Sequence, residues 1–401
     1  MKVDQPILGK SGTLLLLTIL GAFPPLTIDL YLPALPQMAE TFATSHTMVN
    51  LTLGAFMVAF AIGMLFWGPL SERTGRKPIL LTALAFYITS SLLCAIASSV
   101  DALIVFRILQ GLAGGGVTVI GTSIVKDLFD GRERERAMAL IMSLVTIAPM
   151  IAPVLGAFLL KIASWRMMFV VLAIFGAGAT LLVACYRETL TEKTTGPLTK
   201  TWGRLGIVMK NPRFAFLLAI FALVPMALMA FLGISSYVYI DRFGLSEQAF
   251  SFIFAINAGA AALGPVLYLK LSRFISVRTL ILGCFVTLSL AGIAMLSVGS
   301  FSPLLFAALA AVSTLAVITV RVPGANLLLE QQSKDTGSAA ALIQFSGMMM
   351  GAASIQIVST LSPDLIQNYG VLLIVVGATC AALWTAVQHR PFVVEKLFQP
   401  S

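Results

Sequence analysis

Apolar stretches of about 20 residues recur along the whole chain, and short polar segments separate them. A helix of about 20 apolar residues is long enough to cross the hydrocarbon core of a bilayer. Short turn segments such as "SSVD", "GSFSP" and "LSPD" divide the most closely spaced stretches. The pattern therefore predicts an all-α membrane protein with twelve transmembrane helices, at residues 13–36, 47–70, 78–98, 101–125, 136–160, 165–187, 214–239, 248–271, 278–299, 302–329, 337–361 and 365–388.

The longest polar stretch, "ETLTEKTTGPLTKTWGRLGIVMKNPR", follows the sixth predicted helix. It divides the chain into a six-helix bundle at residues 1–187, a linker at 188–213 and a second six-helix bundle at 214–401. A faint repeat supports two pseudo-symmetric halves. The basic loops after the second and eighth helices read "GPLSERTGRKP" and "KLSRFISVR", and a Gly-Pro pair stands at the start of the first loop and a few residues before the second. We expect the linker to be cytoplasmic.

Lysine and arginine are distributed unevenly between the predicted loops. If the N-terminus is cytoplasmic, all but five of the 26 basic residues fall in inside segments. Lys161, Arg166 and Arg242 lie in outside loops, and Arg107 and Arg321 lie within helices. Because cytoplasmic loops carry an excess of basic residues, this bias predicts that both termini are cytoplasmic. It also accounts for the net charge of +9 without a nucleic-acid partner.

The composition excludes several classes of protein. Only 11% of the residues are charged and 58% are hydrophobic, whereas soluble domains are about 25% charged. The four cysteines form no CxxC pair and there are two histidines, so we expect neither a disulfide nor a metal site. No GxxxxGK[ST] loop is present for a nucleotide. An intramembrane enzyme would need a catalytic constellation that these residues do not supply, so we predict neither an enzyme nor a non-transporting receptor.

One acid, Asp29, lies inside the first apolar stretch, in "LTIDLYLPALP". A charged side chain at the centre of a bilayer costs about 2.5–3.5 kcal/mol and normally faces the protein interior beside a partner. Arg107, in the fourth predicted helix, lies at a similar depth, about 9 Å against about 12 Å, at a rise of 1.5 Å per residue. We therefore expect Asp29 and Arg107 to form an ion pair. Because burial favours the neutral acid and a nearby guanidinium favours the carboxylate, we predict that Asp29 is a titratable switch.

The loop "GPLSERTGRKP", residues 68–78, resembles the signature of the major facilitator superfamily, G-x-L-[S/A]-D-R-x-G-R-[R/K]-P, with Glu72 in place of the usual Asp. In that family the acid meets the N-terminus of the eleventh helix, and a charge network closes the cytoplasmic side. Thr336 and Ser338 are capping candidates at that N-terminus. We expect Asp127, at the end of the fourth helix, to pair with Arg73. The resemblance assigns this cytoplasmic gate to Gly68, Glu72, Arg73, Gly75, Arg76, Lys77 and Asp127.

The fifth predicted helix contains "TIAPMIAPVLGAF", with Pro149, Pro153 and Gly156. Membrane helices tolerate proline where neighbouring groups satisfy the freed carbonyls. The spacing resembles the antiporter motif of exporters in the same superfamily. We expect this helix to pack against small residues of the eighth helix, where Gly259 and Gly264 permit a close approach.

The stretches "IDLYLPALP", "FRILQG" and "GRKPILL" resemble the bicyclomycin and chloramphenicol resistance (Bcr/CflA) group of drug:proton antiporters, as do "SWRMMF" and "TGSAAALIQF". The resemblance implies a major facilitator fold that exports a small amphipathic drug by alternating access, and hence multidrug resistance. It implies the proton as coupling ion, no cofactor, a location in the bacterial inner membrane, and a fold that needs only a monomer. The acid of the group's D-x-Y-L-P motif, which serves proton coupling and substrate recognition, falls on Asp29.

Arg321, in "VITVRVPGANLLLE" of the tenth helix, departs from the group's pattern. It either reaches towards the cytoplasm, where it can pair with Glu330, or it stands in the cavity and binds an anionic group. The second interpretation favours an alternative function, a metabolite or anion porter for nucleosides, amino acids or siderophore-like anions. The candidates for the substrate cavity are Asp29, Tyr31, Phe56, Arg107, Tyr237, Asn257, Arg321 and Asn326.

Overall fold

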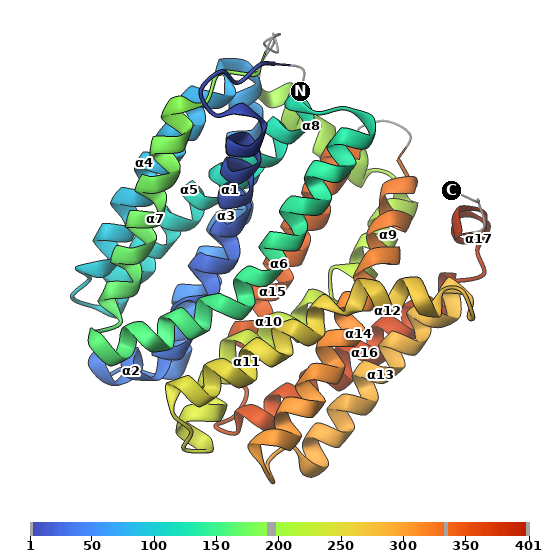
Figure 1. Ribbon diagram of the computed structural model, residues 1–401. Coiled ribbons are helices and arrows are strands. Elements are labelled where there is room, and N and C mark those ends of the chain that lie inside the picture. Colours follow the sequence, from blue (N-terminus) through green and yellow to red (C-terminus); the bar gives the residue numbers. More distant parts are fainter. Residues whose placement is uncertain (1–2, 191–197, 333–335, 398–401) are drawn as a thin grey trace. The chain divides into compact units, whose positions relative to one another are not determined.

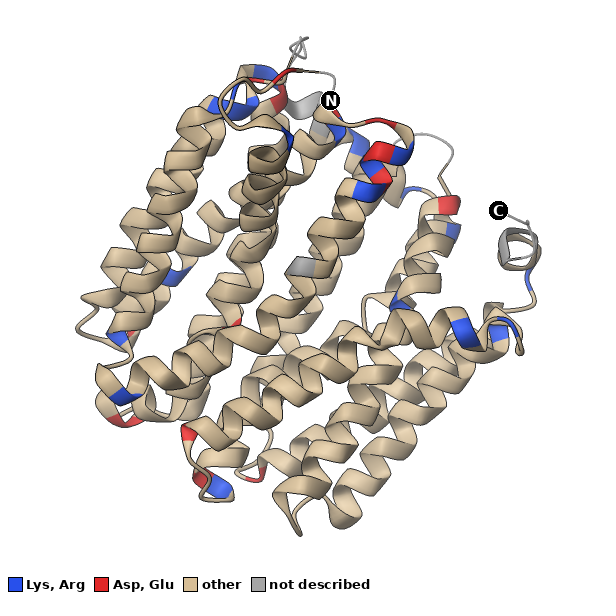
Figure 2. Cartoon of the chain, in the orientation of Figure 1, with Lys and Arg blue, Asp and Glu red and all other residues tan. Residues whose placement is uncertain are grey.

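The computed structural model of the chain describes residues 3–190, 198–332 and 336–397, and their secondary structure is helical (Figure 1). Within these described ranges, twelve helical segments are long and apolar enough to cross a membrane. The predicted all-α, twelve-helix class is therefore confirmed. Charged residues gather near the ends of the long helices and are rare in the middle of these helices (Figure 2), as expected where lipid surrounds the middle of a bundle.

The chain divides into two compact units, Met1–Thr201 and Trp202–Ser401, so the division falls inside the predicted linker. Residues 191–197 of that linker lie outside the described residues, and α8 (Leu198–Met209) follows this gap. Residues 333–335, before the eleventh crossing, also lie outside them. The further elements of unit 1 are α1 (Gly9–Asp29), η1 (Leu32–Ala34), α2 (Leu35–Thr41), α3 (His46–Thr74), α4 (Arg76–Ala95), α5 (Val100–Leu128), α6 (Gly131–Ile162) and α7 (Arg166–Cys185). Those of unit 2 are α9 (Pro212–Phe221), α10 (Pro225–Ser236), η2 (Tyr237–Arg242), α11 (Glu247–Ala262), α12 (Gly264–Leu271), α13 (Val277–Val298), α14 (Pro303–Glu330), α15 (Thr336–Thr360), α16 (Leu365–Val387) and α17 (Pro391–Leu397).

Each unit pairs its six crossings in the same way. In unit 1, α1 packs on α6, α3 on α5 and α4 on α7. In unit 2, α10 packs on α15, α11 and α12 on α14, and α13 on α16. In both units the first crossing therefore meets the fifth, the second meets the fourth, and the third meets the sixth. This repetition is the pseudo-symmetry that the faint sequence repeat predicts.

Serine residues cap the second and fourth crossings of both units. Ser45 and Ser99 accept hydrogen bonds from the backbone N–H three residues ahead, at 3.3 and 3.2 Å. Ser246 and Ser302 do the same in unit 2, at 3.2 Å each. A serine at this position satisfies one of the free N–H groups at the start of a helix. The caps also give the two units a common register for comparing residues.

The first crossing of each unit is interrupted, at points where the sequence predicts one continuous helix. In unit 1, α1 ends at Asp29, and η1 and α2 follow, each with a proline near its start. In unit 2, the chain breaks between α9 and α10 just before Pro225. Proline lacks the N–H that would continue the helical hydrogen bonds, which explains both sets of breaks. The interruption after Asp29 gives this acid a place at a helix end.

Candidate functional site

Arg107 of α5 is completely buried in unit 1. Its Nη1 donates hydrogen bonds to the side-chain oxygen of Gln110 at 2.6 Å and to the carbonyl of Thr27 at 3.4 Å. Its Nη2 donates to the hydroxyl of Tyr31 at 3.2 Å. The guanidinium carbon also lies 4.2 Å from the centre of the Phe56 ring and 4.6 Å from that of Tyr31. Neutral oxygens and aromatic faces thus hold this cation.

The hydrogen bonds continue from Arg107 to α4. The amide nitrogen of Gln110 donates to the hydroxyl of Ser91 at 2.8 Å. The hydroxyl of Thr27 lies 2.5 Å from that of Tyr87 and also donates to the carbonyl of Phe23. All of these side chains are buried. The network therefore joins three crossings of unit 1 around one charge.

The predicted ion pair between Asp29 and Arg107 is not formed in this structure. Asp29 is 4% exposed, and its Oδ1 has no hydrogen-bond partner within the described ranges. The reason is helical geometry. Thr27 and Tyr31, which contact Arg107, are four residues apart and share one face, whereas Asp29 lies midway between them and points away from that face. Asp29 and Arg107 were predicted to lie at a similar depth in the membrane, but the side chain of Asp29 does not point towards Arg107.

The Gly156 of the predicted antiporter motif packs directly on the break that follows α1. A Cβ atom at this position would lie 1.9 Å from the carbonyl oxygen of Leu30, so only glycine permits the observed approach of α6. Leu30 is the residue after Asp29, which places the motif beside the candidate proton site. Pro149 and Pro153 lie inside α6. In unit 2, Gly264 faces Ile318 of α14; the packing of the motif on Gly259 and Gly264 stays a prediction.

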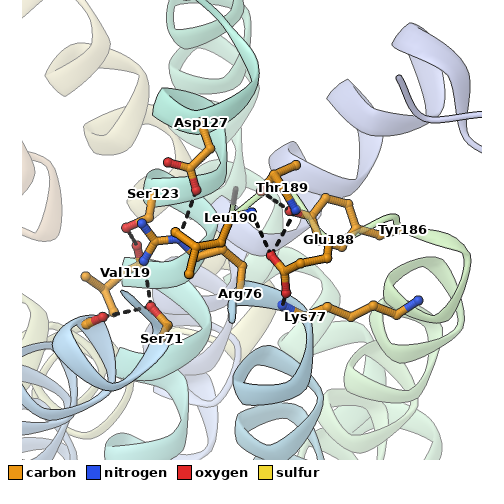
Figure 3. A network of polar contacts seen from close by, with 11 residues as sticks. Ser71, Arg76, Lys77, Val119, Ser123, Asp127, Tyr186, Glu188, Thr189 and Leu190 are labelled. Carbon is orange, nitrogen blue, oxygen red and sulfur yellow. Dashed lines mark hydrogen bonds and ion pairs between the residues drawn. The ribbon is translucent and has the colours of Figure 1, made fainter. Parts of the chain in front are cut away.

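In the signature loop, Asp127 pairs with Arg76, and the predicted pairing with Arg73 is wrong. The Nε of Arg76 lies 2.9 Å from Oδ2 of Asp127, and its Nη1 donates to the hydroxyl of Ser71 at 2.7 Å (Figure 3). Arg73 is in the last turn of α3 and is exposed, whereas Arg76 begins α4 and is 5% exposed. Gly68 lies within α3 and Glu72 is half-buried. The contact of Glu72 with the start of the eleventh crossing stays a prediction.

Glu188, at the start of the predicted linker, contacts this loop. Its Oε2 accepts a hydrogen bond from the backbone N–H of Lys77 at 2.9 Å (Figure 3). Nearby, burial raises the pKa of the Tyr186 hydroxyl, which hydrogen-bonds with the hydroxyl of Thr189. One signal could have indicated such a contact. Gly75 precedes α4 and has no side chain to cap it, so an acceptor must come from elsewhere or from water.

The remaining cavity candidates differ in exposure. Tyr31 and Phe56 are 0% and 1% exposed and face Arg107, and Tyr237 and Asn257 are also buried. Asn326 and Arg321 are exposed on α14. The Nη2 of Arg321 donates to the side-chain oxygen of Gln344 at 3.3 Å, so Gln344 is its partner and the pair with Glu330, one of the two alternatives, is not formed. The role of these residues in a cavity stays a prediction.

The whole chain resembles known transporters. Residues 17–355 match the family model of the Major Facilitator Superfamily. The chain belongs to the Major Facilitator Superfamily, and it is a multi-pass membrane transporter, not an enzyme. Among solved structures it is similar to a peptide transporter POT in complex with sulfate, with a TM-score of 0.78 at 14% identity over 99% of this chain and 98% of that one. That similarity concerns the fold.

Three relatives are more similar in sequence. The MFS-type transporter YdgK of Bacillus subtilis is 31% identical over 84% of this chain and 86% of its own length. The bicyclomycin resistance protein homolog of Haemophilus influenzae is 30% identical over 62% of this chain and 64% of its own. The chloramphenicol resistance protein of Pseudomonas aeruginosa is 30% identical over 62% and 59%. The matches thus span about three fifths of the two resistance proteins, and they confirm the resemblance to the bicyclomycin and chloramphenicol resistance group.

Proposed function

We propose that the chain is a secondary transporter that exports a small amphipathic, drug-like compound in exchange for protons, by alternating access. The observation that carries the proposal is the state of Asp29, a buried carboxyl group inside a membrane crossing whose Oδ1 has no partner among the described residues. The names of the relatives, which refer to bicyclomycin and chloramphenicol resistance, support a drug-like substrate.

The position of Asp29 suits a proton switch. A carboxylate that is enclosed and unpaired changes its free energy strongly when water reaches it. Movement that opens or closes the site therefore changes whether Asp29 holds a proton. The break after α1, against which Gly156 packs, lies next to this residue. Competition between proton and substrate at Asp29 then couples inward proton flow to export, with the proton as coupling ion and no other cofactor.

We also propose how the chain is oriented in the membrane and that it acts as a monomer. The excess of Lys and Arg in alternate loops supports cytoplasmic termini in a bacterial inner membrane. The loop at residues 68–78 then lies at the cytoplasmic side, where it serves as a gate. A monomer in the lipid bilayer is sufficient for alternating access between two bundles.

Transport by purified protein in proteoliposomes tests the proposal, with labelled chloramphenicol as the probe and an imposed pH gradient as the driving force. We expect Asp29→Asn to lose gradient-driven transport but to keep exchange of labelled for unlabelled chloramphenicol across the membrane. Because Oδ1 makes no hydrogen bond, this change should leave the melting temperature nearly unaltered. Asp101→Asn, which alters an exposed acid at the start of α5, is the matched control. Equal gradient-driven transport by wild type and Asp29→Asn would refute the coupling role.

A second function, a porter for an anionic metabolite, is favoured by Arg321. Its side chain is exposed and hydrogen-bonds with the neutral Gln344, without a carboxylate partner in the described part of the chain. In that case Arg321→Ala should abolish the transport of an anion yet spare neutral chloramphenicol. A panel of labelled nucleosides, amino acids and iron-chelating anions, measured with wild type and variant, separates the two functions.

A further inference from the structure

The start of α4 lacks a cap of its own. Gly75, the residue before the helix, has a φ angle of +129°, a conformation that residues with a side chain rarely adopt. It therefore leaves free the N–H groups that a serine or aspartate would normally bind. The backbone N–H of Lys77 donates instead to Oε2 of Glu188, a residue 111 positions further along the chain. A Cβ atom on residue 75 would lie 2.8 Å from this same oxygen.

The carboxylate of Glu188 is held on its other side as well. Its Oε1 accepts hydrogen bonds from the backbone N–H groups of Thr189 and Leu190, both at 2.9 Å (Figure 3). Hydrogen bonds to an ionised acceptor are about twice as strong as neutral ones, and a negative charge is favourable at a helix N-terminus. One carboxylate thus binds the segment after α7 to the start of α4.

Two further contacts hold the end of α7 and the segment after it, one from the start of α4 and one from the residues before α1. The Nζ of Lys77 donates to the carbonyl of Ala184, near the end of α7, at 2.8 Å. The amide side chain of Gln5 exchanges two hydrogen bonds with the backbone of Arg187, at 2.8 and 3.0 Å. The residue next to Lys77 is Arg76, whose guanidinium binds Asp127 of α5. A shift at the start of α4 therefore moves Arg76 relative to Asp127.

We propose that Glu188 is a positioning residue for the signature loop. Its carboxylate fixes the N-terminus of α4, keeps Arg76 on Asp127, and makes the first residues of the linker move together with the loop during transport. The role rests on the proposed transport function, but the geometry can be tested without transport.

Hydrogen–deuterium exchange of the full-length protein in detergent tests the geometry. In Glu188→Ala the amides of Lys77, Thr189 and Leu190 lose their acceptor. Deuterium uptake in peptides covering residues 73–80 and 186–190 should therefore become about fivefold faster, because the loss of an average helix cap changes the equilibrium between closed and open forms by about this factor. Glu188→Gln retains an acceptor oxygen and should show a smaller rise. Glu133→Ala, which removes an exposed carboxylate paired with Lys10, is the control and should leave both peptides unchanged. Unchanged uptake in Glu188→Ala, or a uniform rise over the whole protein, would overturn the contact.

Chloramphenicol transport by the same variants tests the positioning role. Because Glu188 acts through the loop and not on the substrate, Glu188→Ala should lower the maximal rate severalfold and leave KM unchanged. Glu188→Gln should restore part of the rate. Local exchange changes with a normal rate would refute the positioning role, and a change confined to KM would do the same. If wild type moves no chloramphenicol, the proposed function fails, while the exchange result still decides whether Glu188 holds the loop.

Discussion

The two units repeat one pattern of helix pairs but build their interiors from different chemistry. The serine caps Ser99 and Ser302 set a common register for α5 and α14. Eight residues after the cap, unit 1 has Arg107 and unit 2 has Ala310, and both are completely buried. Eleven residues after the cap stands Gln110 in one unit and Ser313 in the other. The same helical position thus holds a hydrogen-bonded cation in unit 1 and a methyl group in unit 2.

The residues around these two positions differ in the same way, with polar groups beside Arg107 and aromatic rings near Ala310. In unit 2, Ser313 hydrogen-bonds with the hydroxyl of Tyr369 at 2.9 Å. The Tyr369 ring is part of an aromatic cluster with Phe231 and Phe306, and Phe231 stacks on Phe254 at 5.9 Å. In unit 1, aromatic rings lie against the Arg107 guanidinium. The fold therefore requires no particular polarity at this position, and the charge in unit 1 calls for a functional reason.

Ala310→Arg would make unit 2 resemble unit 1 at this position, and it should have the largest effect. We expect the free energy of unfolding to fall by several kcal/mol, because the effective penalty for burying an unpaired ion is of that size. Ala310→Met, which adds volume without charge, should cost about 1–3 kcal/mol. Thermal unfolding in detergent, followed by tryptophan fluorescence, compares the two. Equal stability of both variants would show that unit 2 accepts a charge as readily as unit 1.

Arg107→Ala makes the opposite change and should have the next largest effect. It removes the donors to Gln110 and Tyr31 and the contacts with two rings, so we expect a loss of about 2–3 kcal/mol. Arg107→Lys keeps the charge but not the planar fork, and its stability should be intermediate. The same unfolding measurement applies. A neutral outcome for Arg107→Ala would mean that the network contributes little to folding.

Removing one tyrosine hydroxyl from each unit tests whether the polar contacts act together. Tyr87→Phe and Tyr369→Phe should each cost about 1 kcal/mol, the usual contribution of one hydrogen bond. In combination with Arg107→Lys, only Tyr87→Phe should show non-additive stability, since its partner Thr27 also binds Arg107. Additive behaviour of both pairs would contradict a joined network in unit 1.

Arg321→Ala should change stability least, by no more than about 0.5 kcal/mol, because its side chain is exposed. Unfolding of Gln344→Ala, which removes the other partner, gives the control. A large loss in Arg321→Ala alone would indicate that unit 2 also depends on a charge for folding.

The twelve crossings could be predicted from sequence because a bilayer imposes one length and one polarity on every crossing. The breaks inside these crossings were harder to predict from the sequence. The predicted helix at 214–239 is divided into α9, α10 and η2, and the first crossing is interrupted after Asp29. Proline marks such sites, but whether a helix bends or stops depends on what packs against it.

The sequence indicates candidate residues for the site, but the contacts of these residues differ from the predicted ones. The sequence indicated Asp29 and Arg107 through their depth, yet pairing also depends on the direction around the helix, and Thr27 and Tyr31 occupy the side that faces Arg107. Arg73 and Arg76 were both in the signature loop, and the turn at Gly75 determines which one reaches Asp127. Glu188 could not be assigned from local pattern, because its partner lies 111 residues earlier in the chain.

That separation has a consequence for biosynthesis. The ribosome releases α4 long before Glu188, so the start of this helix enters the membrane without its acceptor. Gln5, near the beginning of the chain, likewise cannot make its hydrogen bonds with Arg187 until that residue, 182 positions later, has been synthesised. Both contacts can form only once the sixth crossing has been made, and domains generally fold as units during synthesis. A nascent chain that stops shortly before Arg187 has all six crossings of the first bundle but lacks both of these contacts, so residues 187–190 are the last of this bundle to take their places.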